Sequence, residues 1–308
     1  MLLSMCMQRP PLSPSDEAMV ASLATRKPSE LVSLQLELAR RLSAKRRPAD
    51  VLAQWRRDPH VAPSALDQRL AVKLDRIALD AAPEYEALLL SPVAPLATCA
   101  ALSPTTQDRS VTTSRTTEVV SDPTNVLALA CARRLAEDPS RHVRLCTVHQ
   151  TLRPQKFPPN EGFSQHFRLF ALVEAGASRP EHGFEGGAIA SLAGVFVRLF
   201  DLVEAEIGCR LADRSARLLL AGTADVLGAR VVAKLREVLP DLPLESEPFA
   251  SGYYDGLRLV VGARAPSGAF IELGDIGVFD WMAKLTSNAR MRFVAGGVGI
   301  QLLPLAFR

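Results

Sequence analysis

The fold of this 308-residue chain is decided by two segments, HVRLCTVHQTL (residues 142–152) and SQHFRLFALVEAG (residues 164–176). Both contain several β-branched or aromatic residues, which favour strands. The polar loop between them, RPQKFPPNEGF, contains three prolines and a glycine, residue types that interrupt strands and favour turns. We therefore predict an antiparallel hairpin with a long connecting loop.

Helical and extended segments surround this hairpin, and their order indicates the fold class. Leucines at helical spacing and residues suited to helix ends predict helices over 29–47, 48–58, 63–82, 122–138, 187–208, 223–240 and 279–287. Extended segments are predicted over 85–103, 109–122, 216–222, 256–274 and 289–307, whereas residues 1–27 look irregular. Because most neighbouring strands join as hairpins, we predict an α+β fold with a largely antiparallel sheet.

The composition limits the class of protein. Hydrophobic residues make up 48% of the chain, which is enough to bury a large core, and the net charge is only +3. The five cysteines are scattered and form no CxxC pair, so reduced thiols are expected. The N-terminus lacks the basic segment of a signal peptide, and the apolar run 188–197 is too short to cross a bilayer. We expect a soluble, cytoplasmic protein that does not interact with membranes.

Several common kinds of site are not indicated by the sequence. The histidines have no metal-ligand spacing, and no metal site is predicted. Glycine-rich phosphate loops and the motifs of zinc proteases and serine hydrolases do not occur. A basic cluster at residues 40–47 is compatible with nucleic-acid binding, although a solvated helix end is the simpler interpretation, so a nucleic-acid partner is not expected.

Five short motifs occur in an order that is similar to a known family. They are RIALDAAPEYEALLLSPVAPL (76–96), SDPTNVLAL (121–129), GYYDGLRLVV (252–261), GVFDWM (277–282) and GGVGIQLL (296–303). The chain resembles the catalytic domain of class II aminoacyl-tRNA synthetases, especially the histidyl type, and the synthetase-like regulatory subunit of ATP phosphoribosyltransferase. The resemblance covers roughly residues 66–303 and implies an antiparallel sheet flanked by helices.

The resemblance also implies a domain organisation and an assembly. Residues 66–308 would form the catalytic-type domain, and residues 1–65 would be an N-terminal helical extension. The chain ends just after the third family motif, so an anticodon-binding domain is not expected. The first motif, which ends at Pro92 or Pro95, is a dimer interface in the family and implies a homodimer.

Most of the candidate ligand-binding residues follow from the family motifs. Asp122 and Thr124 match the acid and threonine that hold the amino group of the substrate, and Phe167 matches the aromatic residue that stacks on adenine. Tyr253 and Tyr254 match the paired tyrosines of the histidyl type. Together with Glu272, these residues imply a pocket for an amino acid or a similar small metabolite.

The residues that would activate ATP depart from the family. Leu302 stands where the third motif has its phosphate-binding arginine, and Gln301 stands where it has an acid. In the second motif, the arginine position falls on Gln150 in one alignment and on Arg153 in another. A third departure is Phe249, at the position of the histidine-specific arginine. Because arginine pairs with phosphate through a rigid fork, these losses weaken adenylation.

Two functions are compatible with this pattern. The first is a synthetase-like paralogue that has lost aminoacylation and binds a small metabolite or regulates a partner enzyme, without a cofactor. The alternative is an ATP-dependent amino-acid ligase that uses Mg²⁺ and transfers its product to an acceptor other than tRNA, with Arg153 as the catalytic cation.

Overall fold

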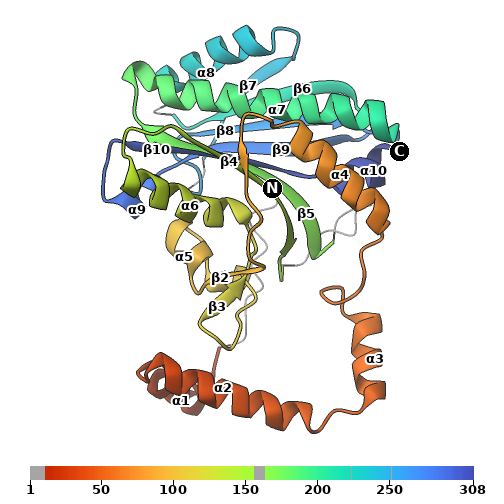
Figure 1. Cartoon of the computed structure of the whole chain (residues 1–308), viewed down its shortest axis with the longest axis vertical. Coiled ribbons are helices and arrows are strands. Elements are labelled where there is room, and N and C mark those ends of the chain that lie inside the picture. The colour runs from red at the N-terminus through yellow and green to blue at the C-terminus, as the bar shows by residue number, and fades with distance from the viewer. Residues whose placement is uncertain (1–10, 156–163, 223, 251) are drawn as a thin grey trace.

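A computed structural model of the chain describes residues 11–155, 164–222, 224–250 and 252–308. Its centre is an eight-stranded sheet with the strand order β1-β4-β5-β10-β9-β8-β6-β7 (Figure 1). These strands are β1 Glu86–Ala87, β4 Val143–Leu152, β5 His166–Ala177, β10 Met291–Gly299, β9 Phe270–Phe279, β8 Leu257–Arg264, β6 Ala212–Leu220 and β7 Leu244–Pro248. The two outermost pairs, β1–β4 and β6–β7, are parallel and the others are antiparallel. The predicted α+β class with a largely antiparallel sheet is confirmed.

The hairpin that was expected to decide the fold lies within this sheet. Strands β4 and β5 pair without interruption from Val143 opposite Ala175 to Leu152 opposite His166. Because side chains of a strand alternate between the two faces of the sheet, the hairpin contributes side chains to the hydrophobic core on both faces. Most of the connecting loop, residues 156–163, lies outside the residues that the structure describes.

One face of the sheet is covered by long helices. Helix α7 (Gly183–Ile207) lies along the strands, α4 (Gln68–Asp80) lies beside it, and α8 (Asp225–Val238) packs against α7 (Figure 1). Phe196 of α7 is completely buried and points at the glycines Gly274 and Gly296, where a β-carbon would come within 2.6 and 3.2 Å of its ring. The glycines therefore form a recess in the sheet that the aromatic ring fills.

Helix α7 is the one described helix that is long and apolar enough to cross a membrane by length and composition. The apolar run 188–197, which is too short to cross a bilayer, is only part of this helix. In this fold most of the helix is buried against the sheet and its neighbours, with Phe196, Leu199 and Phe200 fully inaccessible to solvent. Its apolar composition is accounted for by its position in the core.

The other face of the sheet carries shorter helices and the second part of the core. Helix α6 (Pro123–Glu137) packs on β4 and β5, and α9 (Trp281–Thr286) packs on β10. A small hairpin of β2 (Val93–Pro95) and β3 (Thr117–Val119), with helix α5 (Thr98–Leu102), lies below α6 (Figure 1). This arrangement brings the segment before α6 close to the strands of the sheet.

The structure corrects several boundaries predicted from the sequence. Residues 14–24 form helix α1 rather than an irregular segment, and residues 98–102 and 302–307 form helices α5 and α10 rather than continuing extended segments. The segment 109–122 contains only the short strand β3, and β7 was not anticipated. In the segment 109–122 propensity was overridden because β-branched residues indicate a strand only where a pairing partner is available.

The first three helices differ from the other described α-helices in having no buried residue. They are α1 (Pro14–Ala24), α2 (Pro28–Ser43) and α3 (Pro48–Arg57), and they extend away from the sheet (Figure 1). The apolar side chains of Leu38, Leu42 and Trp55 remain 58%, 56% and 47% exposed. The structure thus contains the helices expected for the N-terminal extension, while the domain boundary at residue 65 remains a prediction.

We expect that deleting residues 1–57 changes the free energy of unfolding of the remaining chain by less than about 1 kcal/mol, because the deleted helices bury little apolar surface. The measurement is a urea titration followed by the fluorescence of Trp281, which is the one tryptophan left after the deletion. Residues 58–65 are kept because the ring of His166 hydrogen-bonds to the carbonyl of Ala62 at 2.7 Å. A loss above about 2 kcal/mol would show that the helices stabilise the body.

Candidate functional site

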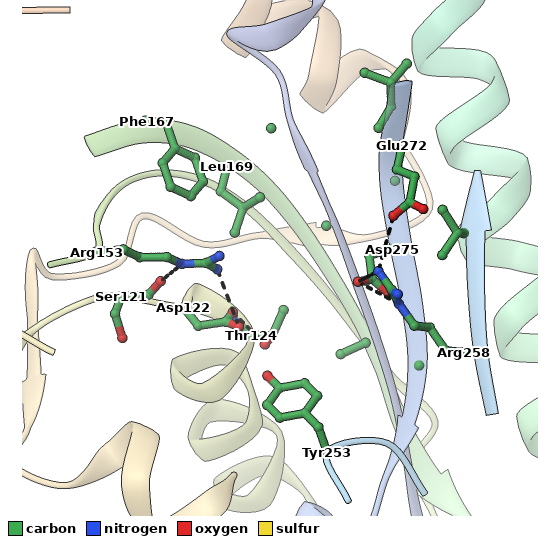
Figure 2. A pocket seen from close by; sticks show the side chains of 18 of the residues that line it. Ser121, Asp122, Thr124, Arg153, Phe167, Leu169, Tyr253, Arg258, Glu272 and Asp275 are labelled. Atoms are coloured by element: carbon green, nitrogen blue, oxygen red, sulfur yellow. Dashed lines mark hydrogen bonds and ion pairs between the residues drawn. The ribbon is translucent and has the colours of Figure 1, made fainter. Parts of the chain in front are cut away.

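A cavity of about 290 Å³ opens on the α6 side of the sheet. Its wall comes from the segment before α6, from the β4–β5 hairpin and from strands β8, β9 and β10 (Figure 2). The polar or aromatic residues along this wall include Arg109, Ser121, Asp122, Thr124, Arg153, Phe167, Tyr253, Tyr254, Arg258, Glu272, Asp275 and Gln301. The size is near the lower limit for small-molecule sites and suits a metabolite as small as an amino acid.

Glycines of the central strands form part of the cavity wall. A β-carbon on Gly277 would overlap the ring of Tyr254, so no larger residue fits there without a shift. A β-carbon on Gly299 would meet no atom within 4 Å, because it would project into open space. The cavity is therefore kept open at Gly299 by the absence of a side chain.

The acidic end of the cavity lies at the beginning of α6. The Oδ1 atom of Asp122 accepts hydrogen bonds from the backbone N–H of Thr124 at 3.0 Å and from its hydroxyl at 2.7 Å. Asp122 is thus the N-cap of α6, with Pro123 in the first turn. Burial, together with the Asp122 carboxylate, raises the pKa of Tyr253, so this phenol stays protonated.

Strand alternation places Arg153, and not Gln150, on the cavity side of the sheet. Arg153 lies over the cavity, where its Nε donates to the carbonyl of Ser121 at 2.9 Å and its guanidinium lies 3.9 Å from Asp122. The guanidinium carbon is also 5.2 Å from the centre of the Phe167 ring, within reach of a cation–π interaction (Figure 2). The side chain of Gln150 points to the opposite face and contacts the ring of His166, so it does not line the cavity.

A second charged group lies across the cavity and was missed from the sequence. Arg258 of β8 donates to both carboxylate oxygens of Asp275 on β9, with distances between 2.8 and 3.1 Å. The hydroxyl of Tyr254 donates to the same carboxylate at 2.8 Å. Glu272 lines the cavity as expected, but it is paired with Arg217 and lies 3.7 Å from Arg258. Alternation along β8 and β9 was the signal that could have revealed this pair.

The charged pair affects the ionisation of its members. Burial alone would lower the pKa of Arg258, but the hydrogen bonds and charge of Asp275 outweigh burial, and the net effect raises it. Burial, followed by the Asp275 carboxylate, raises the pKa of Tyr254. Arg258 therefore stays charged and Tyr254 stays a hydrogen-bond donor in the neutral pH range.

The end of β10 differs from a phosphate-binding wall. Leu302 lines the cavity at the position where the family resemblance expects an arginine. Gln301 is buried, where it accepts a hydrogen bond from the backbone of Arg168 at 3.3 Å and donates to Ser164 at 3.0 Å. Arg308 contacts the carbonyl of Ile207 at the end of α7 and does not line the cavity. This wall is apolar at Leu302 and neutral at Gln301.

Glu118 supports the segment that carries the cavity wall. It is buried and accepts hydrogen bonds from the backbone N–H groups of Ala97 and Cys99 and from the side chain of Gln107, at 2.7 to 3.0 Å. A carboxylate held by several donors organises a loop, and Glu118 does not line the cavity.

Across the described parts of the chain, no three His, Cys, Asp or Glu residues lie close enough to hold a metal ion.

Comparisons with known proteins identify the fold. No protein-family model matches the sequence, and no curated protein matches it. The structure is similar to apo histidyl-tRNA synthetase from S. aureus (12% identity, TM-score 0.59, covering 80% of this chain and 68% of that chain). It is also similar to an ATP phosphoribosyltransferase regulatory subunit/histidyl-tRNA synthetase from Bacillus halodurans (12% identity, TM-score 0.56, covering 80% and 81%).

A third similar structure is a histidine–tRNA ligase subunit from Alicyclobacillus acidocaldarius (12% identity, TM-score 0.55, covering 81% of this chain and 96% of that chain). Identities this low show a shared fold and leave the activity open. The predicted architecture is confirmed: this chain has the class II synthetase-like fold, with its cavity on the α6 side of the antiparallel sheet.

Proposed function

We propose that this protein binds a small metabolite with an amino group, of the amino-acid type, and that it has lost adenylation. The observation that carries this proposal is the set of contacts that the Arg153 side chain makes. Its guanidinium is hydrogen-bonded to Ser121, faces Asp122 and stands over Phe167, the ring assigned by resemblance to adenine stacking. The guanidinium of Arg153 thus covers the ring that would stack on adenine, and it bonds to the protein where the family arginine would bind a phosphate.

The opposite wall also favours the loss of adenylation. Charge develops on the α-phosphate during adenylation, and each missing preorganised donor typically costs about 10²–10³-fold in rate. Leu302 cannot supply such a donor, and Gln301 is occupied by hydrogen bonds to Arg168 and Ser164. The cavity retains the features for binding and lacks those for activating ATP.

An ammonium group fits the acidic end of the cavity. Oδ1 of Asp122 is occupied by Thr124, while Oδ2 lies 3.9 Å from Arg153, which is longer than a hydrogen bond. This oxygen can accept a charge-assisted hydrogen bond from a ligand amine. Asp122 and Thr124 would then form the amine site, with the phenol of Tyr253 nearby.

A regulatory role in a homodimer fits the same picture. The similar protein from Bacillus halodurans is described as an ATP phosphoribosyltransferase regulatory subunit/histidyl-tRNA synthetase, and the first part of this description is compatible with a role that depends on binding. Helix α4 and the segment after it resemble the dimer-forming motif, and they leave apolar side chains uncovered: Val72, Leu79 and Leu89 are 60%, 37% and 99% exposed. We propose that a second copy of the chain binds this apolar surface and that a partner enzyme binds elsewhere on the protein.

A second candidate function is the ATP-dependent ligase. The observation in its favour is that Arg109 and Arg153 both line the cavity, so two guanidinium groups are near a ligand. ATP and Mg²⁺ would be required, and Arg153 would have to leave Ser121 to reach a phosphate. ATP–pyrophosphate exchange with the twenty amino acids and Mg²⁺ separates the two functions, and we expect no exchange from the folded protein.

The amine site is tested by the substitution Asp122→Asn. We expect affinity for the best-binding amino acid to fall about 10–100-fold, because a charge-assisted hydrogen bond is worth about 1.5–3 kcal/mol. Asparagine is as good an N-cap as aspartate, so α6 should be unaffected. Calorimetric titration, with the amino acid chosen in a thermal-shift screen, gives the measurement.

The matched control is Asp280→Asn, since Asp280 also lies at the start of a helix but outside the cavity. It should leave the affinity unchanged. Exchange of pyrophosphate with any amino acid would establish the ligase instead. Binding that is equally strong in the Asp122 variant would remove this residue from the amine site.

A further inference from the structure

We propose that Arg258 is the anion-recognising residue of this cavity and that it holds the carboxylate of the ligand. This inference rests on the proposed function, because it places a second functional group of the same amino-acid-like metabolite. It assigns the ligand class more narrowly: a zwitterion whose amine meets Asp122 and whose carboxylate meets Arg258. The two residues belong to different walls of the cavity (Figure 2).

The position of Arg258 results from the register of β8 and β9. Leu257, Leu259 and Val261 point into the core beneath α7, so Arg258 points to the opposite face, where it lines the cavity. Its side chain is only 15% exposed. A guanidinium this enclosed has lost most of its hydration, which makes the remaining protein and ligand contacts energetically important.

The contacts of Arg258 orient its guanidinium. The Nε and Nη2 atoms are held by Asp275, which is itself hydrogen-bonded to Tyr254, and the guanidinium carbon stands 5.5 Å from the centre of the Tyr254 ring. Within the part of the chain that the structure describes, Nη1 makes no hydrogen bond. The N–H groups of Nη1 are therefore available to donate to an oxygen of a ligand.

A purely structural ion pair between β8 and β9 accounts for less of this geometry. Such a pair would need only Arg258 and Asp275, and it would not explain why the arginine lines a cavity with Nη1 left over. The acid nearest after Asp275, Glu272, is held by Arg217 and lies 3.7 Å from Nη2. The guanidinium is therefore neutralised by one close carboxylate and keeps the two N–H groups of Nη1 for an oxygen of a ligand.

The position also compensates for a departure noted in the sequence. Phe249 replaces the family arginine ahead of the paired tyrosines, and its ring packs 5.9 Å from that of Tyr254. Arg258 brings a guanidinium to within 5.5 Å of the centre of the same ring. Carboxylate and phosphate oxygens would both satisfy Nη1, and the experiment below distinguishes them.

The experiment uses the full-length protein with its arginine side chains labelled with ¹⁵N, and it follows the Nε and Nη signals during titration with acetate and with inorganic phosphate. Signals of Arg258 are assigned by their loss in Arg258→Gln. We expect acetate to shift these signals more than phosphate does at equal concentration, because the small cavity and the nearby Asp275 disfavour a dianion. A larger shift with phosphate would overturn the carboxylate assignment.

A second arm compares each amino acid with its carboxamide. We expect the wild-type protein to prefer the acid by at least about 10-fold, as for a charge-assisted hydrogen bond, and Arg258→Gln to lose this preference. Arg258→Lys keeps the charge without the fork and should keep part of it. Asp275→Asn leaves the guanidinium less neutralised and should tighten acetate binding, a result that a merely structural pair would not produce.

The outcomes separate this inference from the proposed function. If acetate shifts the Arg258 signals while no amino acid binds, the anion site stands and the amino-acid function falls. If amino acids bind but Arg258→Gln keeps the wild-type preference for the acid over the amide, the amino-acid function stands and the anion site is overturned. Should Arg258→Gln fail to fold, the Asp275→Asn result decides, and unchanged or weaker acetate binding contradicts the proposal.

Discussion

Phe196→Ala is expected to lower the free energy of unfolding by about 3–5 kcal/mol, the range for removing a buried aromatic side chain. The effect should fall in this range because the ring of Phe196 fills a recess that Gly274 and Gly296 leave in two central strands. These strands are held by neighbours on both sides and cannot move together to close the space. The substitution therefore leaves a cavity as well as losing the transfer free energy of the ring.

Urea denaturation of the wild-type and variant proteins measures this effect. The matched control is Phe270→Ala, which removes the same side chain from β9 where it is 38% exposed. The control should lose about 1 kcal/mol, as is usual for partly exposed positions. A loss below about 1 kcal/mol for Phe196→Ala would mean that the glycine recess closes, which contradicts the packing argument.

Gly299→Leu is expected to reduce amino-acid binding by at least about 100-fold, because excluding a ligand costs its whole favourable binding free energy. A side chain at Gly299 would project into the cavity, where a β-carbon meets no atom within 4 Å. The fold should be preserved, since leucine in a strand replaces a glycine that contributes no packing. Calorimetric titration gives the affinity, and urea denaturation shows that stability stays within about 1 kcal/mol of the wild type.

The matched control for this prediction is Gly187→Leu. Gly187 is a position in α7 where a β-carbon also meets no atom within 4 Å, and it does not line the cavity. This variant should bind the ligand as the wild type does, and Gly299→Ala should give an intermediate loss. Full-strength binding by a folded Gly299→Leu protein would show that the ligand site lies elsewhere.

Periodicity accounts for the elements that the sequence predicted well. The hairpin of β4 and β5, the helix that Asp122 and Pro123 begin, and the β8–β9 hairpin are long enough for a repeat of two or of 3.6 residues to be read directly. Two of the segments that were wrong are short. Residues 98–102 and 302–307 form helices. Segments of five or six residues are too short to show a helical repeat in the sequence, so their structure depends on contacts with the rest of the fold.

The sequence by itself determined most of the strands and helices and the largely antiparallel sheet, because these depend on local patterns along the chain. The order of its short motifs indicated the class II synthetase-like fold by resemblance, and with it several residues that line the cavity, such as Asp122, Phe167 and Tyr253. Only the tertiary structure decided that Arg153 and not Gln150 lines the cavity, and that Arg258 and Asp275 form a pair along its β8–β9 wall. A shift of one residue in a strand moves a side chain to the other face of the sheet. The register is set by pairing with strands that are distant in the sequence, and local sequence patterns do not reveal which strands pair.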